Sequence, residues 1–362
     1  MQNTKVLPVS SPLLNGYSHY GSIFSILGTL GDSYFPWLFS RFAQLVADPV
    51  NENAGLYINI DEPEWFPRTT NFCPFIDTNI ISKKMFDLRN KIVDSIIDAL
   101  QQDYYVFMVV EQYYIPDTDA YKKFSHNHDI MIYGFDRDKK TLYIADNFNG
   151  KYQFSECYFS QFVDAYYHTN EEKDRLNSNI LLFKKKKLHT EFDQLRLIDN
   201  LNSYLTGIYP EMRSSHWHQH FQGWAKGLDI YLNVKEYLYL LKSSRAKFDK
   251  RTFYAIWEHK KLMVMRIEYM HNNNYITNAN IILERYQHIE RLTLKHQNMI
   301  IKFGLTGNSS LIETVIREID EVSEMEKQLI PNILKNLHTP ELDQNTKILG
   351  LQMNHKLKWN LT

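Results

Sequence analysis

The chain has 362 residues, of which 44% are hydrophobic and 23% charged, with a formal net charge of -1. This length is sufficient for two domains, and the composition is ordinary for a soluble globular protein. A charge so close to zero gives no reason to expect DNA, RNA or an anionic membrane as a partner. The chain has two cysteines, Cys73 and Cys157, which excludes a dense disulfide framework.

Residues 1–10 lack the apolar core of a signal peptide. The longest apolar runs, such as Ile130 to Tyr133, have the length of a strand rather than of a membrane span. We therefore expect a cytoplasmic protein without a membrane-spanning segment.

The hydrophobic pattern changes near residue 190. Before it, strands rich in Val, Ile and aromatic residues are predicted at 104–112, 129–135, 141–146 and 179–183, and helices at 19–30, 83–102 and 155–167, the last with Ser155 as N-cap. After it, helical periodicity runs through 253–270, 278–303 and 309–337, separated by short polar breaks typical of a helical bundle. The sequence predicts an α+β domain at residues 1–188 followed by an all-α domain at residues 189–362.

The segment from His126 to Asp146 carries the strongest indication of chemistry. His128 begins one predicted strand and Asp146 ends the next, with a tight turn between them. Two adjacent antiparallel strands bring the start of one close to the end of the other. A carboxylate that holds an imidazole in one tautomer is how a general base is oriented. The alternative is that His128 only caps a strand and Asp146 only begins a turn.

A second indication lies at Ser18, which precedes a predicted helix with small residues near its start and one apolar face. Such a position suits a nucleophile, because the helix dipole stabilises an anion and free N–H groups can hold an oxyanion. The plainer interpretation is an ordinary serine N-cap.

This order of a nucleophile helix, a His and an Asp resembles papain-like cysteine peptidases. The similarity is closest to the bacteriocin double-glycine-leader peptidases and to the butirosin-biosynthesis acyltransferase H family. It is carried by the run from Val109 to Pro116, by His128 through Tyr133-Gly134-Phe135-Asp136, by Ala145-Asp146-Asn147, and by the strand and helix pattern at 152–163. This similarity covers about residues 10–185. Residues 190–270, including the run from Trp257 to Met263, look like the helical extension of related proteins of nonribosomal-peptide gene clusters. The resemblance implies a papain-like fold and a Ser18–His128–Asp146 site.

The chain departs from this family at the nucleophile, where the family has Cys. Apolar spacing places that position at Ser18, with Tyr20 as the alternative. The family's oxyanion-hole Gln is absent, and Asn15 is the nearest amide. Three interpretations follow: a natural serine enzyme, an inactive enzyme retained as a binding protein, or a Cys replaced by Ser.

The other polar clusters receive structural interpretations. His216, His218 and His220 lack a neighbouring acidic or Cys ligand, so a polar loop is favoured over a zinc site. Cys157 is expected to be buried in a helix, and Cys73 is too far from any predicted helix N-terminus to be an attractive nucleophile. Glu258 and His259 are expected to be a buried pair. We predict no cofactor and no metal.

The resemblance implies acyl or peptidyl transfer, or thioester or amide cleavage, in specialised-metabolite biosynthesis. An acyl or peptidyl carrier protein and a small-molecule or peptide acceptor would be the partners. The alternative is an inactive papain-like domain that binds a peptide synthetase or carrier protein, and a plain peptidase is a third possibility.

Overall fold

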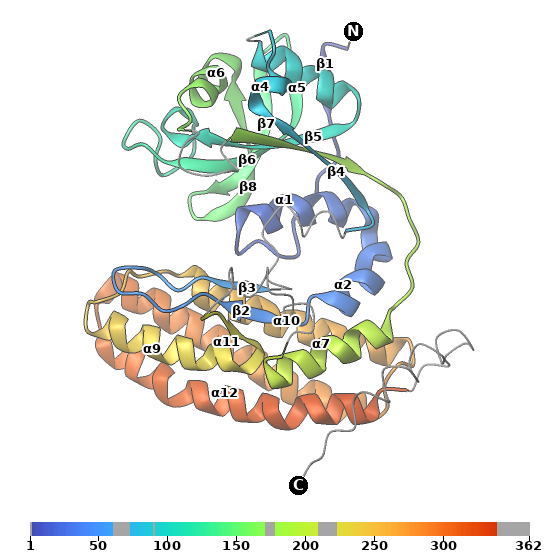
Figure 1. Cartoon of the computed structure of the whole chain (residues 1–362), viewed down its shortest axis with the longest axis vertical. Helices are drawn as coiled ribbons and strands as arrows, with labels where there is room; N and C mark the ends of the chain where they lie inside the picture. The colour runs from blue at the N-terminus through green and yellow to red at the C-terminus, as the bar shows by residue number, and fades with distance from the viewer. Residues whose placement is uncertain (1, 61–72, 90, 171–177, 209–222, 339–362) are drawn as a thin grey trace.

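The computed structural model describes residues 2–60, 73–89, 91–170, 178–208 and 223–338. Within these ranges the fold is mixed α and β, with a large antiparallel sheet from the first half of the chain and a layer of long helices from the second (Figure 1). This coarse division into a sheet half and a helical half agrees with the sequence prediction.

The large sheet has seven strands among the described residues, in the order β4–β9–β5–β6–β7–β8, with β1 also paired to β6. Every one of these pairings is antiparallel. The strands are β1 (Thr4–Val6), β4 (Ile76–Ser82), β5 (Tyr104–Glu111), β6 (Asn127–Asp136), β7 (Thr141–Phe148), β8 (Lys151–Tyr158) and β9 (Asn179–Lys185). β5 lies in the middle of the sheet and is buried along nearly its whole length, which explains its run of Val, Phe and Met.

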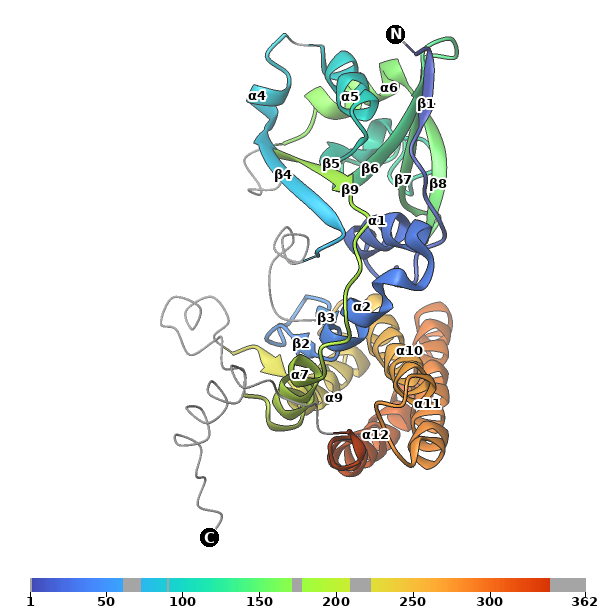
Figure 2. The ribbon, with the colours of Figure 1, turned by 90° about the vertical axis from the view of Figure 1, so that its right-hand side faces the viewer.

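Helices cover both faces of this sheet (Figure 2). α1 (Ser18–Leu27) packs on β6 and β7, whereas α5 (Ile92–Gln101) and α6 (Phe159–Tyr167) contact β5 from the other side. α1 continues into the 3₁₀ helix η1 (Gly28–Tyr34) and then α2 (Phe35–Arg41).

The helical half consists of α7 (Gln194–Thr206), α9 (Ile230–Lys242), α10 (Arg251–Asn272), α11 (Ala279–Thr306) and α12 (Ser309–Asn336). α10 packs on α11, α11 on α12, and α12 on α9, as expected for neighbours joined by short loops. None of the described helices is both long enough and apolar enough to cross a membrane.

A small second sheet joins the two halves. β2 (Leu45–Ala47) pairs with β3 (Ile58–Ile60) on one side and with β10 (Ala225–Lys226) on the other, and β3 contacts α10. β10 leads into the 3₁₀ helix η6 (Gly227–Asp229) before α9. Strands from both sides of residue 188 thus share one sheet, which the predicted division of the chain did not anticipate. The second part is also not helical throughout, because β10 belongs to it.

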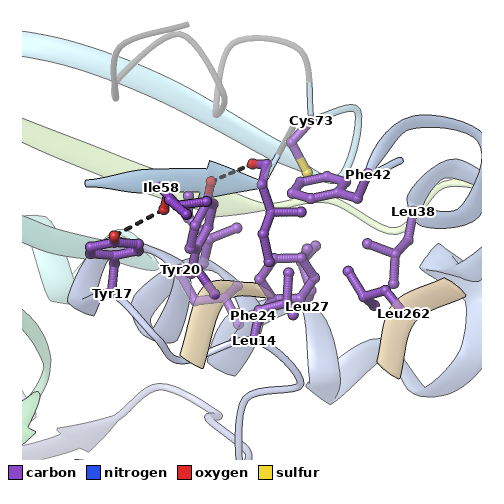
Figure 3. Close-up of a cluster of buried hydrophobic side chains, with 14 of the residues drawn as sticks. Leu14, Tyr17, Tyr20, Phe24, Leu27, Leu38, Phe42, Ile58, Cys73 and Leu262 are labelled. Carbon is purple, nitrogen blue, oxygen red and sulfur yellow. Dashed lines mark hydrogen bonds between the residues drawn. The ribbon is translucent and has the colours of Figure 1, made fainter. Parts of the chain in front are cut away.

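α10 is tied to the first half by buried contacts. The Arg266 guanidinium is fully buried and donates to the carbonyl oxygens of Phe39 and Phe42 at 2.7 Å each, which satisfies carbonyls left free at the end of α2. Figure 3 shows Leu262 of α10 in the same apolar cluster as Leu38 and Leu27. The halves therefore share a continuous core.

Two predicted helices differ from the structure. The helix predicted at 155–167 begins only at Phe159, because residues 151–158 form edge strand β8. At the start of the helix the Gln161 Oε1 accepts the Tyr158 N–H at 3.1 Å. The helix predicted at 83–102 is two helices, α4 (Lys83–Phe86) and α5. Ser155 is therefore in a strand and does not cap a helix.

Candidate active site

His128 and Asp146 meet where β6 and β7 pair. The register places Met131 opposite Ala145, so Asp146 and His128 lie diagonally across the two strands. The His128 Nδ1 lies 3.1 Å from the Asp146 Oδ2 and 3.0 Å from the Asp129 carbonyl oxygen. The predicted contact is present. Since Nδ1 is engaged, Nε2 is the ring nitrogen left for a ligand, and it has no hydrogen-bond partner among the described residues.

The Asp146 side chain is fully buried, and both of its oxygens accept hydrogen bonds from groups other than His128. Gln112 Nε2 donates to Oδ2 at 2.7 Å, and the Asn147 N–H donates to Oδ1 at 2.6 Å. Gln112 begins the 3₁₀ helix η2 (Gln112–Tyr114), which follows β5 directly. Gln112 belongs to the run from Val109 to Pro116 that carries the family resemblance, and no role was predicted for it. Its amide fixes the carboxylate that in turn fixes the imidazole.

His128 carries a positive charge at neutral pH. Burial alone lowers its pKa, but the carboxylates of Asp146 and Asp129 outweigh burial and raise it to about 10. In this state His128 donates a proton and does not accept one.

Ser18 opens α1 and is buried, with Tyr17 as the N-cap. Its hydroxyl donates to the Asp129 Oδ2 at 2.6 Å, and no hydrogen bond joins it to His128 within the described part of the chain. The Asp129 Oδ1 lies 3.6 Å from the His128 Nδ1, so one carboxylate joins the two. Asp129 follows His128 directly on β6 and is the residue of this pair that contacts α1. In place of the expected direct contact between Ser18 and His128, the Asp129 carboxylate lies between them. No role was predicted for Asp129 from the sequence.

Tyr20 does not belong to this site. Its side chain is 1% exposed and its hydroxyl donates to the Asn59 side chain and to the Ile60 carbonyl of β3. Figure 3 shows Tyr20 within the core cluster beside Phe24 and Ile58. Of the two positions considered for the nucleophile, only Ser18 contacts the carboxylate beside His128.

His19 was also missed, although it follows Ser18 directly. Its ring stacks on Tyr17, with centroids 5.6 Å apart. Burial is the main cause that lowers its pKa to about 4; the charge on His128 acts in the same direction and Asp129 opposes it. His19 is therefore neutral at pH 7.

Asn15 lies in the loop before α1, and its side-chain oxygen accepts a 2.6 Å hydrogen bond from the Tyr254 hydroxyl of α10. This leaves the carboxamide NH₂ as the donor that can face a ligand. The Asn15 and Gly16 N–H groups both donate to the Glu258 carboxylate, also from α10. Glu258 is therefore not paired with His259, which instead contacts the Ala43 carbonyl and Lys260.

A pocket of about 810 Å³ lies between the sheet half and the helical half and reaches His128. Its sheet-half wall includes Asn15, Gln112, His126, His128 and Tyr152, and its helical-half wall includes Lys250, Arg251, Tyr254, Gln297 and Ile301. Arg251 is already paired with Asp249: its Nε donates to Oδ1 at 2.9 Å and its Nη2 donates to Oδ2 at 2.6 Å. The pocket has the size of a small-molecule site.

The cysteines are not alternative nucleophiles. Cys73 lies in the core cluster of Figure 3, and Cys157 is buried in β8 rather than in the predicted helix. Burial raises the pKa of each thiol to about 12. His216, His218 and His220 lie outside the described residues, and within those residues no three His, Cys, Asp or Glu side chains are grouped to bind a metal ion.

No protein-family model matches this sequence, and no curated protein matches it closely enough to count as a relative.

Proposed function

We propose that this chain is a papain-like acyl or peptidyl transferase of specialised-metabolite biosynthesis that accepts acyl groups from a carrier protein. One observation carries the proposal. The His128 imidazole is fixed at Nδ1 by a buried, fully hydrogen-bonded carboxylate and lines a pocket that two halves of the chain enclose. An oriented imidazole beside a helix N-terminus is the arrangement that activates a nucleophile.

The reaction would run in two steps. The Ser18 Oγ attacks the thioester carbon, a C–O bond forms, the C–S bond breaks, and the hydroxyl proton passes through His128 to the carrier thiolate. An acceptor amine, alcohol or water then attacks the ester, its proton returns to Ser18, and the acyl group leaves on the acceptor. Asp146 keeps Nδ1 protonated and balances the imidazolium that forms. For the first step His128 must lose the proton that it carries at neutral pH, and the Ser18 hydroxyl must exchange its bond to Asp129 for one to His128 Nε2.

The developing oxyanion would be held by two donors. The Ser18 N–H lies in the first turn of α1, where backbone N–H groups have no partner inside the helix. The Asn15 NH₂ is available because Tyr254 occupies the oxygen of the same carboxamide. Asn15 would thereby take the role of the amide that the family supplies from Gln.

A second candidate is an inactive papain-like domain that binds a peptide synthetase or carrier protein. The Ser18–Asp129 hydrogen bond favours it, because a hydroxyl held by a carboxylate is directed away from the base. The raised pKa of His128 favours it as well, because an imidazolium cannot accept the serine proton. A thiol at residue 18 would suit the same charged imidazole far better than a hydroxyl does.

The experiment is incubation of the protein with acyl-loaded carrier protein, followed by intact mass measurement. The proposal predicts an acyl adduct that is lost in Ser18→Ala and retained in Tyr20→Phe, since the Tyr20 hydroxyl lies in the core. An adduct that persists in Ser18→Ala would exclude Ser18 as the acyl acceptor. Binding of the carrier without any adduct would support the second candidate.

A further inference from the structure

Glu258 lies in the middle of α10, is 2% exposed, and points at the loop before α1. Its Oε1 accepts the Asn15 N–H at 2.7 Å. Its two oxygens accept the Gly16 N–H at 3.2 and 3.1 Å. A buried carboxylate from the helical half therefore holds two consecutive backbone amides directly before the nucleophile helix.

Tyr254, one helical turn before Glu258, adds a third bond to the same loop through the Asn15 side chain at 2.6 Å. The close approach depends on glycine at residue 16. A Cβ there would lie 2.6 Å from the Glu258 Oε2 and 2.9 Å from the Tyr254 ring, and both distances are too short for real side chains. The loop and α10 are thus fitted to each other at Gly16.

We propose that Glu258 is a positioning residue for the active site: with Tyr254 it fixes the Asn15–Gly16 loop and so places Ser18 and the Asn15 amide against His128. The inference rests on the proposed function of that site. It makes the helical half a structural part of the active site in addition to any partner surface that it offers.

The protonation state of Glu258 makes this positioning role dependent on pH. Burial raises the pKa of Glu258 to about 7, opposed by the Asn15 and Gly16 N–H bonds and by Lys261. Tyr254 is the other titratable group beside it. The ionised carboxylate accepts at both oxygens, whereas protonation converts one of them into a donor. The hold on the loop is therefore complete well above pH 7 and weakens as the pH falls through about 7.

The test measures iodoacetamide labelling of a thiol at residue 18. Residue 18 should dominate the signal in Ser18→Cys, because burial raises the pKa of both native thiols to about 12, whereas a thiol at residue 18 would lie at a helix N-terminus near the His128 imidazole. At pH 8, adding Glu258→Ala should slow labelling about tenfold or more, because the Asn15 and Gly16 N–H groups lose their charged acceptor and no longer fix the loop before residue 18. Glu258→Gln keeps an oxygen acceptor in the same place and should stay within about threefold of the Ser18→Cys rate.

The pH profile separates positioning from general stability. Between pH 8 and 6 labelling should slow more in Ser18→Cys than in Ser18→Cys/Glu258→Gln, because only the former has a carboxyl at residue 258 that titrates. Thr252→Val is the matched control, since Thr252 is buried on the same helix and donates to the Leu56 carbonyl at 2.6 Å without touching the loop. It should leave the labelling rate and its pH profile unchanged.

The outcomes distinguish this inference from the proposed function. If Ser18→Cys labels no faster than an ordinary exposed thiol, the proposed function fails. If it labels fast, and equally fast when Glu258→Ala is added, the positioning role is refuted while the site stands. Equal slowing by Thr252→Val would also refute it, because the effect would then be one of stability.

Discussion

Each half of the molecule contains a buried charge cluster, and the two are built differently. In the helical half Lys260 and Glu326 are both fully buried, with Lys260 Nζ 2.8 Å from each carboxylate oxygen. The tyrosine hydroxyls of Tyr204, Tyr231 and Tyr286 donate to the same carboxylate at 2.6–3.1 Å. Positive and negative charges are matched one to one and closed off from solvent.

In the sheet half one imidazole faces two carboxylates, and its side chain is 26% exposed. Nδ1 is held, Nε2 is unengaged among the described residues, and a pocket reaches the ring. A closed and balanced network stabilises a fold, whereas an open and unbalanced one has capacity left for a ligand. On the proposed function, the His128 cluster serves chemistry or binding, and the Lys260 cluster serves stability.

The largest expected effect comes from breaking the closed cluster. Lys260→Met leaves the Glu326 carboxylate buried without its cation and should lower the free energy of unfolding by about 3–5 kcal/mol. Urea unfolding at pH 7 measures it. The double variant Lys260→Met/Glu326→Gln should recover much of the loss, because no uncompensated charge remains. A single-variant loss below about 1 kcal/mol would contradict the assignment of this cluster to stability.

A smaller effect is expected in the open cluster. Asp129→Asn removes one of the two carboxylates while leaving an acceptor for Ser18, so the pKa of His128 should fall from about 10 by roughly one pH unit. NMR titration of the His128 ring measures it. An unchanged pKa would show that Asp129 does not act on the imidazole.

The same pairing has a consequence for stability. Because folding raises the pKa of His128, its stabilising contribution is complete below about pH 6.5 and is lost as the pH rises through about 10. In Asp129→Asn that loss should occur at lower pH, as unfolding at a series of pH values would show.

The part of the candidate site that could be predicted from the sequence is the contact that depends on local strand pairing. His128 and Asp146 are 18 residues apart on two strands joined by a tight turn, so their contact follows from hairpin geometry alone. The Ser18–Asp129 bond spans 111 residues and depends on which face of β6 α1 covers. Neither the spacing of apolar residues nor the family resemblance contains that information.

Other misses have equally specific causes. Glu258 contacts the loop at Gly16, 242 residues away, and no sequence pattern around either segment predicts this contact. Strands β1, β2 and β3 have three residues each, too short for alternation to appear. β8 is an edge strand with polar residues on both faces, so its last residues resembled the start of the helix that follows.

The most direct test of the account compares the reactivity of a thiol at residue 18 with and without His128. At pH 7, iodoacetamide should label Ser18→Cys about 100-fold faster than Ser18→Cys/His128→Ala, because an adjacent imidazolium stabilises the thiolate. Tyr20→Cys is the matched control and should label slowly, since residue 20 faces the core at β3. Equal labelling of Ser18→Cys with and without His128, in folded protein, would contradict the claim that His128 and residue 18 form one reactive site.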